Sequence, residues 1–114
     1  MHKHFLLPLL ALLSMSFVLP TFNRQEQWIA LFDGKTLNHW KASENPSTFS
    51  VENGVIVVHG PRAHLFYQGP VLDHAFQNFE LKVRVMTTPG SNSGIFFHTA
   101  FQEKGWPAKG YEVQ

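Results

Sequence analysis

Residues 79–114 read FELKVRVMTTPGSNSGIFFHTAFQEKGWPAKGYEVQ, and their pattern is the clearest indication of the fold class. From Phe79 to Val85, apolar side chains stand at every second position and charged residues stand between them. A period of two is typical of a strand that packs one face on a core and turns the other toward water. We therefore expect a half-buried strand over 79–86.

Turn-forming residues follow this strand. The segment 87–94 reads TTPGSNSG, in which Pro fixes φ, Gly allows positive φ, and Asn and Ser bond to nearby backbone. Residues 95–100, IFFHTA, then read as a return strand. A Gly/Pro-rich loop at 105–110 leads to a further strand at 111–114. The whole segment predicts strand, turn, strand, loop and strand.

Short strands separated by turn signals are also predicted upstream. Residues 28–32 form an apolar run that ends at Asp-Gly, and residues 65–67 form another short strand. Two strands at 49–51 and 55–58 flank Glu-Asn-Gly, and Asn-Gly is the strongest short hairpin signal. Trp40 is expected to fill the core. With no sustained helical period, this pattern favours an all-β sandwich or jelly roll.

Five blocks of the chain resemble, in order and spacing, the sequence of one protein family. They are NSGIFF at 92–97, GYEVQ at 110–114, LFDGKTLNHW at 31–40, VENGVIVV at 51–58 and NFELKVRV at 78–85. Five ordered blocks are far more specific than one short motif. On these residues the chain resembles the 3-keto-disaccharide hydrolase domain family, which lies within the concanavalin A-like lectin and glucanase superfamily.

The resemblance implies a fold that agrees with the strand pattern. The family has a concanavalin A-like jelly-roll β-sandwich whose concave sheet carries the site, and its domains usually continue past the GYEVQ block. We therefore expect residues 28–114 to be the N-terminal part of such a domain, incomplete at the C-terminus, with unpaired strand edges. A body of about 90 residues buries only about 60–65% of its unfolded surface, which argues against function of this part alone.

Composition limits the function classes. The chain has 114 residues, enough for one domain, and its 9 Lys and Arg nearly balance its 8 Asp and Glu. No basic run or Arg-rich helix is present to follow a phosphate backbone, so we expect no nucleic-acid partner. Because the sequence contains no cysteine, disulfides and thiolate metal sites are excluded.

The first residues read as a targeting segment. A short basic start precedes an apolar run from Phe5 to Leu19. This run is shorter than the ~20 residues of a membrane-spanning helix and fits the core of a signal peptide. We assign residues 1–20 to a signal peptide, with an uncleaved membrane anchor as the alternative, and residues 21–27 to a polar spacer. The protein is therefore expected to be exported, to the periplasm or the extracellular space, with no stable membrane partner beyond this leader.

The last strand carries the first candidate for chemistry. Glu112 and Gln114 share a strand face, opposite Tyr111 and Val113. From the residues alone, an ordinary solvent-facing glutamate is the simpler interpretation. The resemblance, however, favours a place in the site. On that basis Glu112 is predicted to be catalytic, as a base or a ligand-orienting group, and Gln114 to bind substrate.

Three further residues are predicted to bind substrate. Asn92 has either a structural role in its turn or a ligand-binding role. His98 is expected to share a face with Phe96, where a structural histidine is the more frequent outcome, and it departs from the Arg that many relatives carry. Trp106 lies in a Gly-rich loop, where its ring can be exposed and can stack on a sugar.

We predict no metal site and no cofactor, with a divalent metal as the alternative. His59 and His64 flank a Gly-Pro-Arg turn without metal-ligand spacing. Asp33 is adequately explained by turn chemistry, because Asp-Gly after an apolar run is a turn signal.

The resemblance implies an exported carbohydrate-active hydrolase, or a lyase and hydratase, that acts on 3-keto-glycosides. A ketone at C3 acidifies the C2 proton, so a carboxylate base can remove it and expel the C1 substituent, after which water adds. A glycoside 3-oxidoreductase acting upstream is the partner that such a substrate implies. A non-catalytic, lectin-like carbohydrate-binding module is the rival function, because the same sandwich serves lectins. A non-functional fragment is the third alternative.

Overall fold

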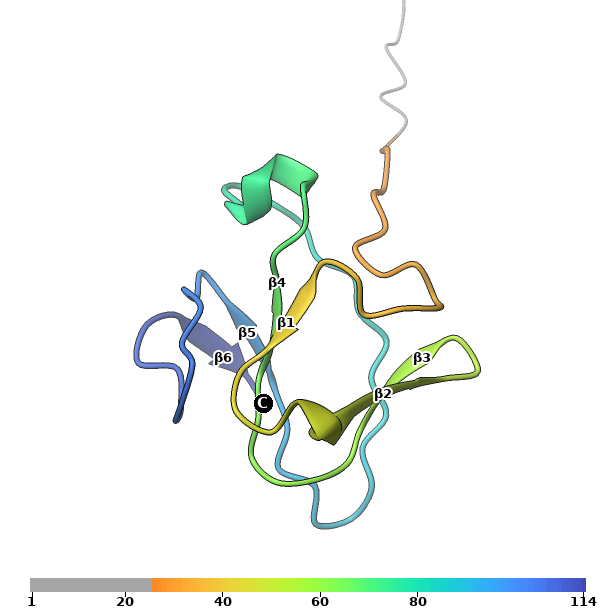
Figure 1. Ribbon diagram of the computed structural model, residues 1–114. Helices are drawn as coiled ribbons and strands as arrows, with labels where there is room; N and C mark the ends of the chain where they lie inside the picture. Colours follow the sequence, from red (N-terminus) through yellow and green to blue (C-terminus); the bar gives the residue numbers. More distant parts are fainter. Residues whose placement is uncertain (1–25) are drawn as a thin grey trace, which may run out of the picture.

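The computed structural model describes residues 26–114, so the predicted leader and most of the polar spacer lie outside the described residues. The described part consists of short strands, two 3-10 turns and irregular segments (Figure 1). In chain order the elements are β1 Trp40–Ala42, η1 Pro46–Thr48, β2 Phe49–Glu52, β3 Val55–Val58, β4 Leu65–Tyr67, η2 Val71–His74, β5 Ile95–Phe97 and β6 Tyr111–Val113. No helix within residues 26–114 is long and apolar enough to cross a membrane.

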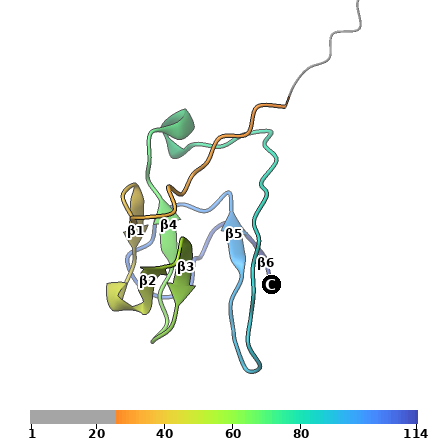
Figure 2. The same ribbon diagram turned by 90° about the vertical axis from the view of Figure 1, so that its right-hand side faces the viewer.

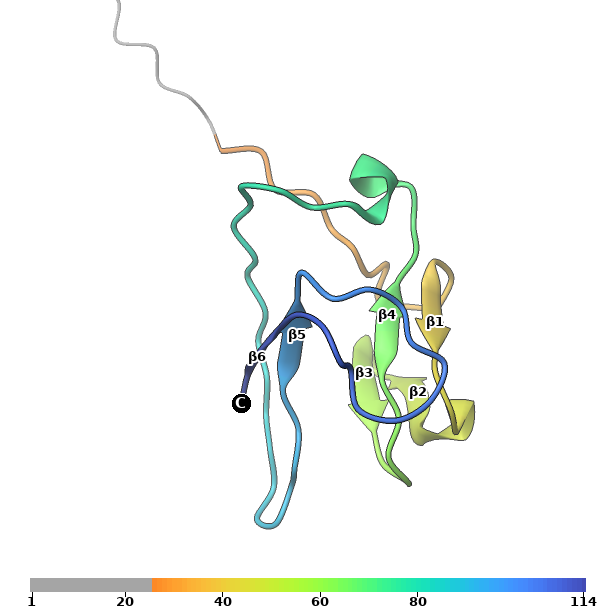
Figure 3. The ribbon, with the colours of Figure 1, turned by 90° about the vertical axis from the view of Figure 1, so that its left-hand side faces the viewer.

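The strands pair in three antiparallel sheets of two strands each, β1 with β4, β2 with β3, and β5 with β6. Two views at right angles to the first show β1 to β4 on one side of the molecule and β5 with its neighbouring extended chain on the other (Figures 2 and 3). This arrangement of small antiparallel sheets is that of an incomplete β-sandwich. The prediction of an all-β fold is confirmed.

The β2–β3 hairpin forms because its turn residues suit it. Asn53 and Gly54 both have positive φ, 49° and 81°, as a two-residue type I′ turn requires. The register places Phe49 opposite Val58. The hairpin predicted from Asn-Gly is confirmed.

A small aromatic core holds β1 and β4 together. Trp40 is opposite Tyr67 in the register, and their rings meet edge to face with centroids 5.3 Å apart. The Trp40 indole Nε1 donates a 3.0 Å hydrogen bond to the carbonyl oxygen of Leu31. Phe66, 9% exposed, packs edge-on against Phe101 with centroids 5.1 Å apart. The core therefore joins β4 to the loop that precedes β6.

The turn predicted at 87–94 is present. The Ser91 amide donates a 3.0 Å hydrogen bond to the carbonyl oxygen of Thr88, and Gly90 has a φ of 83°. Pro89 and Gly90 thus take the central positions of a type II turn. Figures 2 and 3 show extended chain entering this turn and β5 returning beside it.

The strand predicted at 79–86 is not formed, and this prediction was wrong. The segment runs alongside β5 (Figure 2), but within residues 26–114 it joins no ladder. Its apolar side chains stay exposed, from 38% at Phe79 to 93% at Met86. A strand needs a hydrogen-bonded neighbour as well as an alternating pattern, and this segment has no ladder partner within the described residues.

The strand predicted at 28–32 is also absent. Side-chain contacts hold this segment instead. Besides the indole hydrogen bond to Leu31, the Lys82 ammonium lies 3.5 Å from the centroid of the Trp28 ring. An exposed cation–π contact contributes about 0.5–1 kcal/mol, so it links the segment to residues 79–86 without a ladder.

Candidate functional site

Strand β6 fixes the direction of the Glu112 side chain. In the β5–β6 register Glu112 lies opposite Phe96, and Tyr111 lies opposite Phe97. Paired residues of an antiparallel ladder project to the same face. The Phe97 and Tyr111 rings stack with centroids 5.4 Å apart and an interplanar angle of 23°. Glu112 therefore projects with Phe96 to the face opposite this stack.

Gly94 makes room for the Glu112 side chain. A Cβ built on Gly94 would lie 2.8 Å from Cγ of Glu112 and 2.9 Å from the carbonyl oxygen of Val113. Both distances are shorter than van der Waals contact, so no side chain fits there without displacing its neighbours. Glycine is the residue that permits such close approach. The absence of a side chain at Gly94 thus allows the Glu112 side chain to pack against the turn before β5.

Asn92 and Gln114 meet beside Glu112. The Gln114 Nε2 donates a 2.7 Å hydrogen bond to Oδ1 of Asn92, and both side chains are exposed. Each amide keeps polar capacity beyond this bond, the Asn92 Nδ2 as a donor and the Gln114 Oε1 as an acceptor. The structure therefore brings Glu112, Asn92 and Gln114 to the junction of one turn with β6.

His64, just before β4, extends this face. Its ring centroid lies 5.5 Å from that of Phe96 and 5.4 Å from that of Trp106, edge to face in both cases. Its Nδ1 is buried and has no hydrogen-bond partner. Burial lowers the pKa of His64, although the nearby carboxylates of Glu44 and Glu112 act in the opposite direction.

An ion pair lies beside His64. The Arg62 Nε is 2.8 Å from Oε1 of Glu44, and the same oxygen accepts a 3.1 Å hydrogen bond from the Gly105 amide. These bonds hold the pKa of the Glu44 carboxyl below its ordinary value, and the Glu44 carboxylate raises the pKa of Arg62. The Arg62 guanidinium also lies over the Trp106 ring, 5.6 Å from its centroid.

Gln102 organises the loop that carries Trp106. Its Nε2 donates hydrogen bonds to the carbonyl oxygens of Lys104 and Trp106, at 2.6 and 2.7 Å. Its Oε1 accepts a 3.0 Å hydrogen bond from the Ala108 amide. The Trp106 side chain is 54% exposed on this braced loop, so its ring is available to a ligand.

His98 does not lie with the residues around Glu112, and the prediction that it shares a strand face with Phe96 was wrong. The return strand predicted at 95–100 ends at Phe97 because His98 has a φ of 52°, which extended backbone does not allow. The His98 ring instead lies 5.6 Å from the Phe79 ring, between centroids. With Phe97 these residues line an open groove of about 360 Å³.

The structure adds three residues that the sequence did not single out, namely Glu44, Arg62 and His64. They come together through contacts between β4, the segment after β1 and the loop before β6. His64 was noted only as a histidine without metal-ligand spacing. The signal that identifies it, a buried nitrogen without a partner, exists only in the folded chain.

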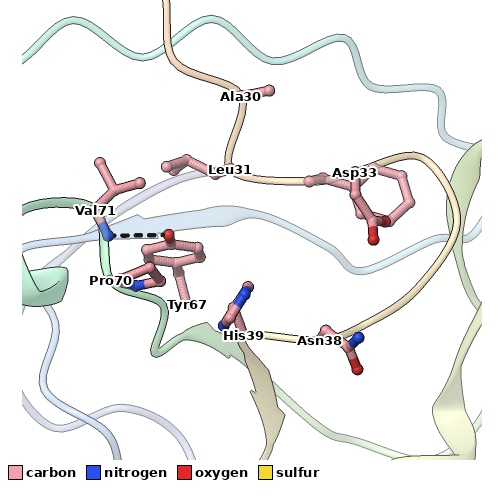
Figure 4. Close-up of a pocket in the computed structure, with 9 residues that line it drawn as sticks. Ala30, Leu31, Asp33, Asn38, His39, Tyr67, Pro70 and Val71 are labelled. Atoms are coloured by element: carbon pink, nitrogen blue, oxygen red, sulfur yellow. Dashed lines mark hydrogen bonds between the residues drawn. The ribbon is translucent and has the colours of Figure 1, made fainter.

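A second hollow, of about 330 Å³, is lined by Tyr67 at the end of β4 and by the segment that contains Asp33 and His39 (Figure 4). Its one carboxylate, that of Asp33, is already engaged. Asp33 accepts hydrogen bonds from the Lys35 and Thr36 amides at 2.8 and 2.7 Å, and from the Thr36 hydroxyl at 2.7 Å. These bonds lower the pKa of Asp33 to about 2. Asp33 thus stabilises the turn through these hydrogen bonds.

Residues 26–114 contain no group of three or more His, Asp or Glu side chains placed to hold a metal ion. The carboxylate of Glu112 is exposed, and two amides, the Phe96 ring and one imidazole lie on the same part of the molecule. This set suits a ligand with hydroxyl groups and an apolar face, because amides bond hydroxyls and aromatic rings stack on C–H surfaces.

Known proteins resemble the chain over this same region. A family model described as 3-keto-alpha-glucoside-1,2-lyase-like domain matches residues 27–114. A 3-keto-disaccharide hydrolase from Bacteroides thetaiotaomicron is 35% identical over 77 residues, which cover 61% of this chain and 27% of that protein. The chain thus spans about a quarter of the length of this curated relative. No solved structure matches the chain. The chain belongs to the family of 3-keto-alpha-glucoside-1,2-lyase-like domains.

Proposed function

We propose that this domain takes part in the cleavage of 3-keto-glycosides, with Glu112 as the base that removes the C2 proton. The family membership and the name of the Bacteroides relative support a carbohydrate substrate of this class. The observation that carries the proposal is the position of Glu112. It shares a face with Phe96 and His64 and adjoins the hydrogen-bonded pair of Asn92 and Gln114.

The reaction needs one well-placed carboxylate. The ketone at C3 acidifies the C2 proton, which Glu112 takes, and the C1–O bond then breaks as a double bond forms between C1 and C2. Addition of water to this double bond completes a net hydrolysis. Ordinary glycosidases place two carboxyl groups on opposite sides of the bond that breaks. Elimination from a 3-keto-glycoside instead needs one carboxylate at the C2 proton, which is the role that we propose for Glu112.

Binding is assigned to the groups around the carboxylate. The Nδ2 of Asn92 and the Oε1 of Gln114 would bond sugar hydroxyls, because their mutual hydrogen bond leaves these atoms available. The exposed Trp106 ring would stack on the sugar. His98 would contribute to binding only through the separate groove that it lines with Phe79. No cofactor is required in this scheme, and loss of activity on chelation would reveal a divalent metal.

The export of the protein and its place in a reaction sequence belong to the same proposal. The signal-peptide pattern of residues 1–20 supports a periplasmic or extracellular location. A 3-keto-glycoside arises by oxidation of the C3 hydroxyl of a glycoside. An oxidoreductase that acts on glycosides must therefore supply the substrate.

The test compares Glu112→Gln with Glu80→Gln, a matched change on the unpaired 79–86 segment. Glu112→Gln keeps the size of the side chain but removes the base, so we expect turnover of a 3-keto-glucoside to be lost. Glu80→Gln should leave turnover unchanged. Retained turnover in Glu112→Gln would refute the assignment.

A carbohydrate-binding module without catalysis is the second candidate, and the exposed Trp106 on its braced loop favours it. In that case Trp106→Ala would abolish sugar binding, whereas Glu112→Gln would leave binding intact and no 3-keto-glycoside would be cleaved by the wild-type protein.

A further inference from the structure

We propose that His64 acts in this site as a neutral hydrogen-bond donor, which stabilises the oxyanion formed when Glu112 removes the C2 proton. This inference deepens the proposed function and rests on it. It starts from an anomaly: His64 Nδ1 is the one buried side-chain nitrogen or oxygen within residues 26–114 that has no hydrogen-bond partner. Such an atom is uncommon in folded proteins and calls for a reason.

The position of His64 is fixed by its backbone. The His64 amide donates a 2.9 Å hydrogen bond to Oγ of Ser43, and the Ser43 amide donates a 2.8 Å hydrogen bond to the His64 carbonyl oxygen. Ser43 is itself buried, with 8% of its surface exposed. The edge-to-face contacts with Phe96 and Trp106 fix the ring as well. A group held in this way can donate a hydrogen bond with little loss of entropy.

The surroundings of His64 favour the neutral imidazole. An imidazolium carries a proton on both nitrogens, so it would bury an N–H at Nδ1 with no acceptor, which is unfavourable. The charged groups near the ring are Glu44, Arg62 and Glu112. Glu44 is committed to Arg62 and to the Gly105 amide, and the Arg62 guanidinium opposes a second positive charge nearby.

The same geometry selects the tautomer. A neutral imidazole carries one proton, on Nδ1 or on Nε2. A proton on Nδ1 would have no acceptor, because this atom is buried without a hydrogen-bond partner. The proton therefore belongs on Nε2, which is not among the buried nitrogens without a partner. Nε2–H is then the donor of His64, whose ring contacts Phe96, the residue paired with Glu112 in the β5–β6 ladder.

The proposed step is an enolisation followed by elimination of the C1 substituent. Glu112 takes the proton from C2, the C2–H electron pair forms the C2=C3 bond, and the C3=O π pair moves onto oxygen. His64 Nε2–H donates a hydrogen bond to this oxyanion without transferring its proton. When the oxyanion collapses, C3=O re-forms, the C2=C3 electron pair moves to form C1=C2, and the C1–O bond breaks with its pair on the leaving oxygen. That oxygen takes the proton from the Glu112 carboxylic acid, which restores the carboxylate. Neutral imidazole is known to play such a role in another proton-transfer enzyme.

The experiment measures cleavage of a 3-keto-glucoside by the intact wild-type chain and by three variants. His64→Phe keeps the aromatic packing but removes the donor, and we expect kcat to fall about 100-fold, the loss typical of one oxyanion-hole donor. His64→Gln keeps a neutral hydrogen-bond donor, so we expect a smaller loss, to about a tenth of wild-type kcat. His59→Phe changes an exposed histidine outside the site and should leave kcat unchanged.

A second measurement is independent of turnover. Nitrogen-15 NMR of the imidazoles should show His64 neutral at pH 7, with its proton on Nε2, and the Nε2 signal should shift when a 3-keto-glucoside is added. An Nδ1–H tautomer, or an imidazolium at pH 7, would overturn the proposal.

The outcomes separate the two proposals. If the wild type cleaves the substrate, Glu112→Gln does not, and His64→Phe retains wild-type kcat, only the role of His64 is refuted. If the wild type neither cleaves the substrate nor exchanges its C2 proton with solvent, the proposed function fails, and this role of His64 fails with it.

Discussion

The amide of Gly105 donates a 3.1 Å hydrogen bond to Oε1 of Glu44 across 61 positions of the chain. The Glu44 amide in turn donates a 3.0 Å hydrogen bond to the carbonyl oxygen of Glu103. These two bonds attach the loop that carries Trp106 to the segment after β1. The loop with the exposed Trp106 ring is therefore held in place by Glu44, a residue far from it in the sequence.

Glu44→Ala should release this loop, because it removes the acceptor of the Gly105 amide. We expect hydrogen exchange at Gly105 to accelerate about tenfold, the factor that matches one hydrogen bond of ordinary net strength. Sugar affinity through Trp106 should fall at the same time. Glu80→Ala, in the 79–86 segment, is the control. Unchanged exchange at Gly105 in Glu44→Ala would show that the bond contributes nothing to the order of the loop.

The pKa of His64 predicts how stability depends on pH. Because burial lowers this pKa below the ordinary 6.5, the unfolded chain binds more protons between the two values, and stability rises with pH across that interval. The contribution is complete above about pH 6.5 and is lost as the pH falls through the folded pKa. Thermal melts should therefore show a larger decrease in Tm from pH 7 to pH 5 for the wild type than for His64→Phe. Equal decreases would contradict the burial of a neutral His64.

The lowered pKa of Asp33 predicts that stability changes in a more acidic pH range. Its pKa is lowered from 3.8 to about 2 by hydrogen bonds to Thr36 and Lys35, so the native state favours the ionised form. The stabilisation is complete above pH 3.8 and is lost as the pH falls through about 2. Asp33→Asn should lower Tm at pH 7 and should differ little from the wild type near pH 2. Asp73→Asn is the matched control, and an Asp33→Asn deficit that persists at pH 2 would contradict this origin.

Gly94→Ala tests the fit between the turn and the carboxylate. Its Cβ would lie 2.8 Å from Cγ of Glu112 and 2.9 Å from the Val113 carbonyl oxygen, so β6 or the Glu112 side chain must move. Overpacking of this kind costs about 1–3 kcal/mol, and we expect turnover to fall with it. Ser93→Ala is the control in the same turn. Wild-type stability and turnover in Gly94→Ala would mean that Glu112 does not need its observed position.

The features predicted correctly from the sequence are local. Asn53-Gly54 specifies its own hairpin because both residues tolerate positive φ. Pro89-Gly90 does the same for the turn between Thr88 and Ser91. Neither feature needs a distant partner, so residue chemistry over a few positions was sufficient.

The features predicted wrongly concern where strands form and where they end. The alternation at 79–86 is a true strand pattern, yet the segment forms no ladder within the described residues, although it runs alongside β5 (Figure 2). His98 fits the alternation of β5 by position, but its φ of 52° ends the strand one residue earlier.

The site was predicted in part. Glu112 and Gln114 could be placed on one face because a strand alternates, whereas His64 could not be placed near them. Its position depends on Ser43, Phe96 and Trp106, which no spacing along the chain brings together.

The fate of the C2 proton shows directly whether Glu112 is the base. A 3-keto-glucoside deuterated at C2 is incubated with the wild type and with Glu112→Gln, and both loss of deuterium to solvent and product formation are followed by NMR. If Glu112 is the base, the wild type releases the deuterium and shows a primary isotope effect on cleavage, and Glu112→Gln does neither. Cleavage with the C2 deuterium fully retained, or deuterium release by Glu112→Gln at the wild-type rate, would show that Glu112 is not the base that removes the C2 proton.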